Sequence, residues 1–246
     1  MKIIFSILAM LALVGKVLAA DAAIGFTAAN KLYAEGKFAG AAAAYESILN
    51  AGVQSPALWF NDGNAKFKAG HLGQAIAAFR QAELLAPRDS EICANLGFVR
   101  NQVQGPSIRA DRWRQWLAAF SLNEWTGIAA AAFWATFLLF AVRQLRPALV
   151  PKLKTISSLF VILTVLSGAA LGFQIDAHFT RPIAVVVEAQ APARSGPFDE
   201  AQIAFTARDG AELPVVDRHG DWVQVSDGAG NIGWLSRKQI TVLPGA

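Results

Sequence analysis

Charged side chains are absent from two long apolar runs, residues 125–142 and residues 155–175. At ~1.5 Å of rise per helical residue, each run is long enough to cross a hydrocarbon core of ~30 Å, the first only just. The connector between them, residues 143–154, contains two prolines and no acid, and its bases are Arg143, Arg146, Lys152 and Lys154. This pattern predicts a two-helix transmembrane hairpin whose basic loop lies in the cytoplasm by the positive-inside rule. Two buried helices of a large soluble core are the alternative.

The N-terminus has the pattern of an export signal. Lys2 precedes an apolar run of about a dozen residues, and small residues follow around Ala20 and Ala22. We expect residues 1–20 to be a signal peptide, cleaved after Ala20 or Ala22, with an uncleaved anchor as the alternative. Either delivers the following segment across the membrane, in agreement with the hairpin. The predicted location is therefore the bacterial inner (cytoplasmic) membrane, with the N- and C-terminal domains on the periplasmic side.

Residues 21–105 contain a helical repeat, because the context of Gly36 recurs around Gly70. The context of Gly70 consists of Trp59, Asn61, Gly63, Ala65, Phe67, Ala75, Phe79, Ala82 and Pro87. This run resembles the tetratricopeptide repeat (TPR), whose length equals the interval between the two glycines. It departs from that repeat at Asp62, where leucine is usual, and at Lys66, where tyrosine is usual. Small residues let the two helices of a repeat approach closely, and Pro87 ends the second helix.

The resemblance to TPR domains implies an interaction groove formed by the first helix of each repeat. The expected partner-binding residues are Phe26, Asn30, Tyr33, Phe60, Asn61, Asn64, Phe67 and Lys68. Asn30 and Asn61 match two positions of the clamp with which some TPR domains hold a C-terminal carboxylate. Phe26, Glu91 and Asn95 stand where that clamp has bases, so we expect a general peptide groove instead. Packing in the core is the alternative role for the aromatic residues.

Residues 106–124 are predicted to form an amphipathic connector on the membrane surface. Trp113, Trp116 and Phe120 recur at spacings of three and four among arginines, which suits aromatic rings at headgroup level. A soluble helix packed on the repeat is the alternative.

After Pro182 the pattern changes to period two, which predicts a small β-domain over residues 182–246. The expected strands are Ile183–Glu188, Ala204–Thr206, Glu212–Asp217, Trp222–Val225, Ile232–Leu235 and Ile240–Leu243. The sequences Gly220-Asp221-Trp222 and Gly233-Trp234-Leu235 resemble those of the bacterial SH3-like β-barrel. In that barrel, Ala189–Ile203 would be the first large loop.

Trp222 and Trp234 are the candidate ligand-groove residues of the SH3-like domain. Trp222 matches the groove tryptophan of SH3 domains that bind proline-rich peptides, whereas Ser236 and Gln239 stand in place of the groove's proline and tyrosine. The resemblance therefore points to peptidoglycan or another protein as ligand. Packing in the barrel is the alternative role for both tryptophans.

Charge and chemistry exclude several function classes. The net charge is +4, but residues 107–181 hold eight bases against three acids, so the excess surrounds the membrane segments and leaves no basis for nucleic-acid binding. Cys93 is the single cysteine, which forbids an intramolecular disulfide. His71, His178 and His219 have no acid or cysteine at metal-ligand spacing. We expect no enzyme, no cofactor and no metal site.

The order of parts predicts a multi-domain α plus β protein: TPR array, two-helix transmembrane hairpin and C-terminal SH3-like β-barrel. This order, together with Asn95–Gln102 and Val185-Val186-Val187, resembles the E-type proteins of the aerotolerance-operon (Bat) family. That resemblance implies a scaffold in an envelope complex linked to stress tolerance. Its implied partners are von Willebrand factor A membrane proteins and a MoxR-type ATPase system. A cell-wall sensor that binds peptidoglycan or peptide through the SH3-like domain is the alternative function.

Overall fold

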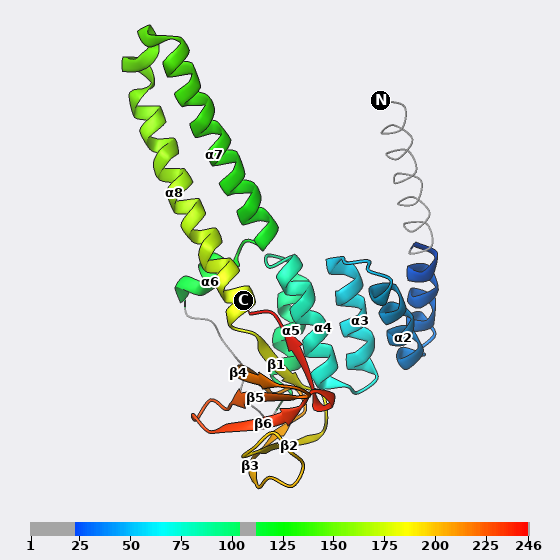
Figure 1. The fold of residues 1–246 in the computed structure, drawn as a ribbon. Coiled ribbons are helices and arrows are strands. Elements are labelled where there is room, and N and C mark those ends of the chain that lie inside the picture. Colours follow the sequence, from blue (N-terminus) through cyan, green and yellow to red (C-terminus); the bar gives the residue numbers. More distant parts are fainter. Residues whose placement is uncertain (1–22, 104–111, 246) are drawn as a thin grey trace, which may run out of the picture.

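The computed structural model describes residues 23–103 and 112–245. The predicted signal peptide and the first part of the connector lie outside these residues. Figure 1 shows three parts: an array of helices, a long helical hairpin and a small sheet beneath them. We call residues 23–103 the helical unit, residues 182–245 the β unit, and the two together the head.

The helical unit is a series of antiparallel helices. After the helix at residues 23–34, it contains α2 (Phe38–Asn50), α3 (Pro56–Lys68), α4 (Leu72–Leu85) and α5 (Ser90–Arg100). The side chains of Ser55 and Asp89 cap the starts of α3 and α5 by accepting hydrogen bonds from backbone N–H groups of the first turn. A Cβ atom on Gly63 would lie 2.8 Å from the Phe79 ring, so glycine is what allows α3 and α4 to pack so closely.

The hairpin consists of two long helices, α7 (Leu122–Leu145) and α8 (Val150–Thr180), joined by a 3-10 turn at Pro147–Leu149. The ends of the predicted basic loop, residues 143–154, continue the two helices, because α7 ends at Leu145 and α8 begins at Val150. Its prolines do not break α8: Pro147 and Pro151 stand at the first positions of helical segments, where the missing N–H has no partner to lose.

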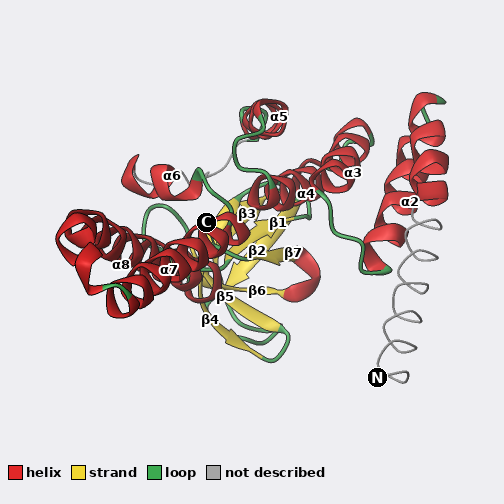
Figure 2. Cartoon of the chain, turned by 90° about the horizontal axis from the view of Figure 1, so that it is seen from above, coloured by secondary structure: helices red, strands yellow, loops and turns green. Residues whose placement is uncertain are grey.

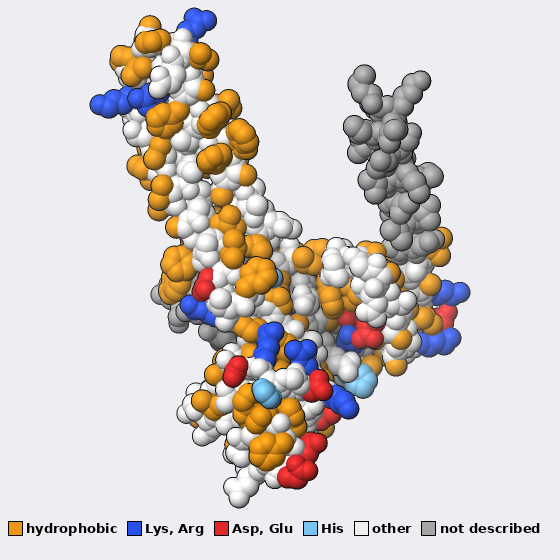
Figure 3. Space-filling model, viewed as in Figure 1, with side chains coloured by type: hydrophobic (Ala, Val, Ile, Leu, Met, Phe, Trp, Pro, Cys, Tyr) orange, Lys and Arg blue, Asp and Glu red, His pale blue; other side chains and the backbone are white. Residues whose placement is uncertain are grey.

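Both hairpin helices are long and apolar enough to cross a membrane. They are unlike core helices of a soluble protein, because only 11% and 17% of their most apolar windows are buried. Figure 3 shows hydrophobic side chains along the hairpin and basic side chains at its tip. Between the helices lie small or hydroxyl residues, including Ala132, Ser167 and Ala170, as in close-packed membrane helix pairs. The Thr136 and Thr164 hydroxyl oxygens are 2.9 Å apart.

In the described part of the connector, residues 112–118 form the helix α6 (Arg112–Ala118). The helix stops because Ser121 starts α7 with a capping box to Glu124, which leaves Phe120 in the turn between them. Trp113 and Trp116 are more than half exposed, whereas Trp125 is buried and donates to the Leu117 carbonyl. Gln174 of α8 donates to the same carbonyl at 2.7 Å, which fixes α6 to the base of the hairpin.

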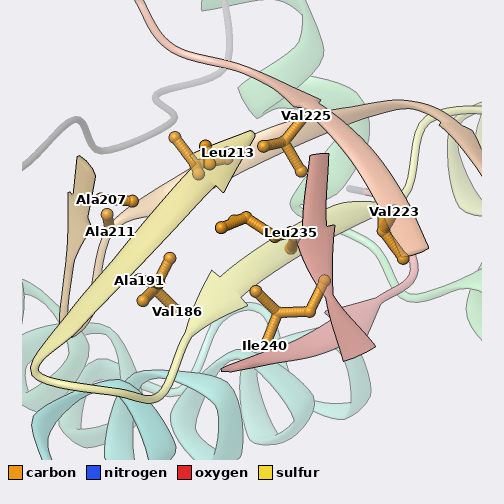
Figure 4. Close-up of a cluster of buried hydrophobic side chains, with 11 residues drawn as sticks. Val186, Ala191, Ala207, Ala211, Leu213, Val223, Val225, Leu235 and Ile240 are labelled. Atoms are coloured by element: carbon orange, nitrogen blue, oxygen red, sulfur yellow. The ribbon is translucent and has the colours of Figure 1, made fainter. Parts of the chain in front are cut away.

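The β unit is an antiparallel sheet in the order β3-β2-β6-β5-β4-β1-β7. Its strands are β1 (Ile183–Val186), β2 (Gln190–Arg194), β3 (Ile203–Arg208), β4 (Glu212–His219), β5 (Trp222–Ser226), β6 (Ile232–Ser236) and β7 (Ile240–Leu243). The short helix Arg237–Gln239 joins β6 to β7. Figure 4 shows the small apolar core of this unit, to which Val186, Ala191, Val223 and Leu235 all contribute.

Two predictions about the β unit were wrong. The sheet does not close into a barrel, because β3 and β7 remain edges and the strands β1 and β7 pack against helix α4 instead. The predicted loop 189–203 contains β2. The alternation of buried and exposed residues in β2 was not evident from the sequence, because the buried residues are the alanines Ala191 and Ala193. Pro192 also argued against a strand, since proline is rare inside strands.

Candidate functional site: the head and its surfaces

The helical unit and the β unit share one hydrophobic core. Ile76, Phe79 and Val99 of the helical unit pack with Val185 and Leu243 of the β unit. Figure 2 shows α4 crossing over the strands β1 and β7. The two units flank the hairpin in the sequence and nevertheless contact each other, so they lie on the same side of any membrane that α7 and α8 cross.

A buried ion network joins the two units. Glu212 of β4 is 1% exposed and accepts hydrogen bonds from Arg80 Nε of α4 (2.8 Å) and from Arg100 Nε of α5 (2.5 Å). Burial raises the pKa of Glu212, but the hydrogen bonds and charges of both arginines outweigh it and hold that pKa below its usual value. A buried carboxylate with two guanidinium partners fixes how the units are oriented.

The start of α4 also depends on the β unit. His71 makes no side-chain cap, and Asp209 accepts the Gly73 N–H at 3.0 Å in its place. Burial raises the pKa of Asp209, and the backbone bonds from Gly73 and Leu72 counteract this. A Cβ atom at Gly73 would lie 1.9 Å from the Val186 carbonyl oxygen, so the contact requires glycine.

The predicted groove residues divide into packing and surface positions. Phe26 packs against Tyr45, Tyr33 against Phe38 and Phe60 against Phe79, with ring centroids 5.2–5.9 Å apart. The asparagines link successive first helices: Asn61 donates to Asn30 at 3.3 Å, and Asn95 donates to Asn64 at 3.1 Å. Lys68 is exposed at the end of α3.

The structure adds Phe98 to this surface, a residue that the sequence analysis passed over. Its ring is 57% exposed and meets Phe67 edge-on, with centroids 5.7 Å apart. Phe98 follows Asn64 by the same interval as Gly70 follows Gly36, so continuing the repeat spacing into α5 would have indicated it. We call Asn61, Asn64, Phe67, Lys68, Asn95 and Phe98 the first-helix surface.

Asp62 and Lys66, the two residues that depart from the TPR pattern, form an ion pair with each other. Lys66 Nζ lies 2.8 Å from Asp62 Oδ2 and 2.7 Å from Glu46 Oε1. Asp62 is fully buried; burial raises its pKa, and Lys66 offsets part of that effect. Two opposite charges at positions i and i+4 therefore replace the usual apolar pair.

Trp222 and Trp234 lie on the outer face of the strands β5 and β6. Trp222 stands opposite Ser236, and Trp234 stands opposite Gln224, so the two rings occupy diagonal positions on one face. Both are half-buried, whereas the alternating Val223 and Leu235 fill the core. Neither tryptophan therefore belongs to the central apolar cluster of the β unit.

Two cavities lie elsewhere on the head, and neither is lined by a predicted groove residue. One, of about 530 Å³, lies between α4, α5 and the base of the hairpin, with Arg80, Arg100, Phe120 and His178 in its wall. The other, of about 470 Å³, lies between α2, α3, α4 and the strand β7. Within the described residues, no group of three or more His, Cys, Asp or Glu could hold a metal ion.

Comparison with known proteins identifies one part of the chain. Residues 187–241 match the family model of the bacterial SH3 domain, and this match covers the β unit from the end of β1 to the start of β7. No curated protein matches the chain. The β unit is therefore SH3-like, a class of module with protein-binding or cell-wall-binding roles.

Proposed function

We propose that this protein is a non-catalytic membrane adaptor that presents one composite head for binding partner proteins. The observation that carries the proposal is the shared core of the helical and β units around Glu212, next to an exposed apolar hairpin. This ion network stabilises one arrangement of the two units. Binding of partners then occurs on a fixed surface.

We further propose that the helical unit is a short TPR array. In its support, three backbone hydrogen bonds around Gly36 recur one repeat later around Gly70, with donors 35, 36 and 37 becoming 69, 70 and 71. Both glycines have positive φ, 75° and 86°. The asparagine pair 30 and 61 recurs as 64 and 95, at the same interval as the glycines.

The proposed location is the bacterial inner membrane, with the head in the periplasm. Arg143, Arg146, Lys152 and Lys154 gather at the hairpin end remote from the head, where the positive-inside rule puts the cytoplasm. At the other end, Arg88 pairs with Glu124 and lies over the Phe120 ring, which connects the head to the base of the hairpin. The head therefore lies close to the membrane surface.

The proposed partners are membrane proteins of the von Willebrand factor A type, in a complex of the aerotolerance (Bat) type together with a MoxR-type ATPase system. We expect crosslinking in cells, followed by solubilisation, to recover them with the wild-type chain. The double variant Lys68→Glu, Phe98→Asp should reduce that recovery about tenfold, since exposed aromatic and charged residues dominate interfaces. Both side chains are exposed, so the fold should survive.

Ile203→Asp is the matched control. Ile203 is 59% exposed on the edge strand β3, remote from the first-helix surface. Its substitution should therefore leave the recovery of partners unchanged. Equal loss in the control and the double variant would contradict a role for the first-helix surface.

The outer face of β5 and β6 supports an alternative function, binding of peptidoglycan. Two half-buried tryptophans on one polar face suit the stacking of sugar rings or peptides. The full chain in detergent should then sediment with purified sacculi, and Trp222→Ala should lower the sedimented fraction at least about fivefold. The full chain is required because the β unit shares its core with α4. If Trp222→Ala and the wild type sediment equally, the outer face of β5 and β6 is not the binding site for peptidoglycan.

A further inference from the structure

Strand β7 is an edge of the sheet, and its register shows which of its backbone groups face outward. Val187 N–H donates to the Gln239 carbonyl at 2.9 Å, in the same ladder that pairs Val185 with Thr241 and Ile183 with Leu243. Hydrogen-bonded pairs alternate in an antiparallel ladder, so Thr241 and Leu243 bond to β1. The N–H and C=O groups of Ile240 and Val242 consequently point away from β1, toward the open edge.

The cavity of about 470 Å³ lies along this edge. Val242 lines the cavity although its side chain packs against the core of the β unit, which leaves its backbone edge to face the open space. The opposite wall is formed by helices α2, α3 and α4. The residues of α4 in this wall are uncharged: Gln74, Ala77, Ala78 and Gln81. An open strand edge inside a groove is the geometry that accepts an added strand.

The groove has an acidic and aromatic wall. Glu46 lines it with 48% of its side chain exposed, whereas Lys66, the base in this wall, is 10% exposed and held between Glu46 and Asp62. Trp59 also lines the groove, and its indole N–H is bound to Gln54 at 2.8 Å, which fixes the ring. An acid near a fixed aromatic ring favours a basic side chain through charge and cation–π attraction.

We propose that this groove, which is separate from the first-helix surface, binds an extended basic segment of a partner protein. The segment pairs with Ile240 and Val242 as an eighth strand of the sheet. It places a lysine or arginine against Glu46 and Trp59.

The test measures binding of a fluorescent eight-residue peptide of alternating valine and lysine to the full chain in neutral detergent. The wild-type chain should bind it, and a peptide with glutamate in place of lysine should bind at least about threefold more weakly. Val242→Pro removes the outward N–H and should raise Kd about fivefold relative to Val242→Ala, which loses similar side-chain packing but keeps the N–H.

A second pair of variants examines the charge without disturbing the strand. Glu46→Gln should raise Kd about threefold, whereas Glu91→Gln, an exposed acid outside the groove, should leave it unchanged. Amide hydrogen exchange at residues 240–243 should slow when the peptide is added. The proposal is overturned if the wild-type chain does not bind the lysine peptide, if Val242→Pro and Val242→Ala bind equally, or if Glu46→Gln and Glu91→Gln behave alike.

Discussion

Glu212→Gln is expected to lower the free energy of unfolding by about 3–5 kcal/mol, because it leaves two arginines near a buried neutral amide. Arg80 and Arg100 have side chains only 7% and 20% exposed, so water replaces the lost carboxylate only in part. The substitution keeps the shape of the side chain, and the loss therefore reports charge rather than volume. Chemical unfolding of the full chain in detergent measures it.

Glu83→Gln is the matched control for this experiment. Glu83 lies 3.9 Å from Arg80 and is 28% exposed, so its loss should cost less than about 1 kcal/mol. Equal effects of the two substitutions would show that the network does not hold the units together.

The same carboxylate predicts a loss of stability in acid. The pKa of Glu212 in the folded chain lies below its ordinary value of 4.5, so its contribution is complete above pH 4.5. The contribution disappears as the pH falls from 4.5 through the lowered pKa. Glu212→Gln should remove this part of the pH dependence from the unfolding curve.

Gly73→Ala is expected to cost about 1–3 kcal/mol of stability, because its Cβ would collide with the Val186 carbonyl of the other unit. The Val186 oxygen belongs to the sheet backbone and cannot move aside, so the units must separate slightly. The hydrogen bond from Gly73 N–H to Asp209 would weaken with this movement. Thermal unfolding of the full chain measures the change.

Gly97→Ala supplies the contrast. Gly97 lies inside α5, and no other described part of the protein comes within 4 Å of an added Cβ beyond the backbone of its own helix and its chain neighbours. Alanine should therefore stabilise the helix by about 0.5–1 kcal/mol. A Gly73→Ala variant as stable as Gly97→Ala would contradict the close packing of α4 on β1.

The parts of the fold that follow from periodicity could be predicted from the sequence. The uncharged runs lie in α7 and α8, and period-two segments such as Trp222–Val225 lie in strands. The sequence pattern indicated secondary structure less well at alanines and prolines. Ala191, Pro192 and Ala193 concealed β2, and the charges and prolines between the two apolar runs gave no sign that helix continues into residues 143–145 and 150–154.

The contact between the units could not be predicted, because its signals are far apart in the chain. Arg80 and Glu212 are separated by 132 residues, and each alone has the ordinary appearance of a surface charge. Likewise Gly73 has no repeat counterpart that would mark it as a contact. Asp62 and Lys66 did carry a local signal, since two departures of opposite charge one helical turn apart predict a pair.

The most direct test of the adaptor account is labelling of cysteines in intact spheroplasts with a maleimide that cannot cross the membrane. Cys93 is native and exposed in the helical unit, and Cys93→Ser allows Ala229→Cys to report the β unit and Ala148→Cys the hairpin tip. The account predicts labelling of Cys93 and of Ala229→Cys from outside, and labelling of Ala148→Cys after lysis alone. Labelling of the two head positions from opposite sides of the membrane would contradict the shared core and the hairpin together.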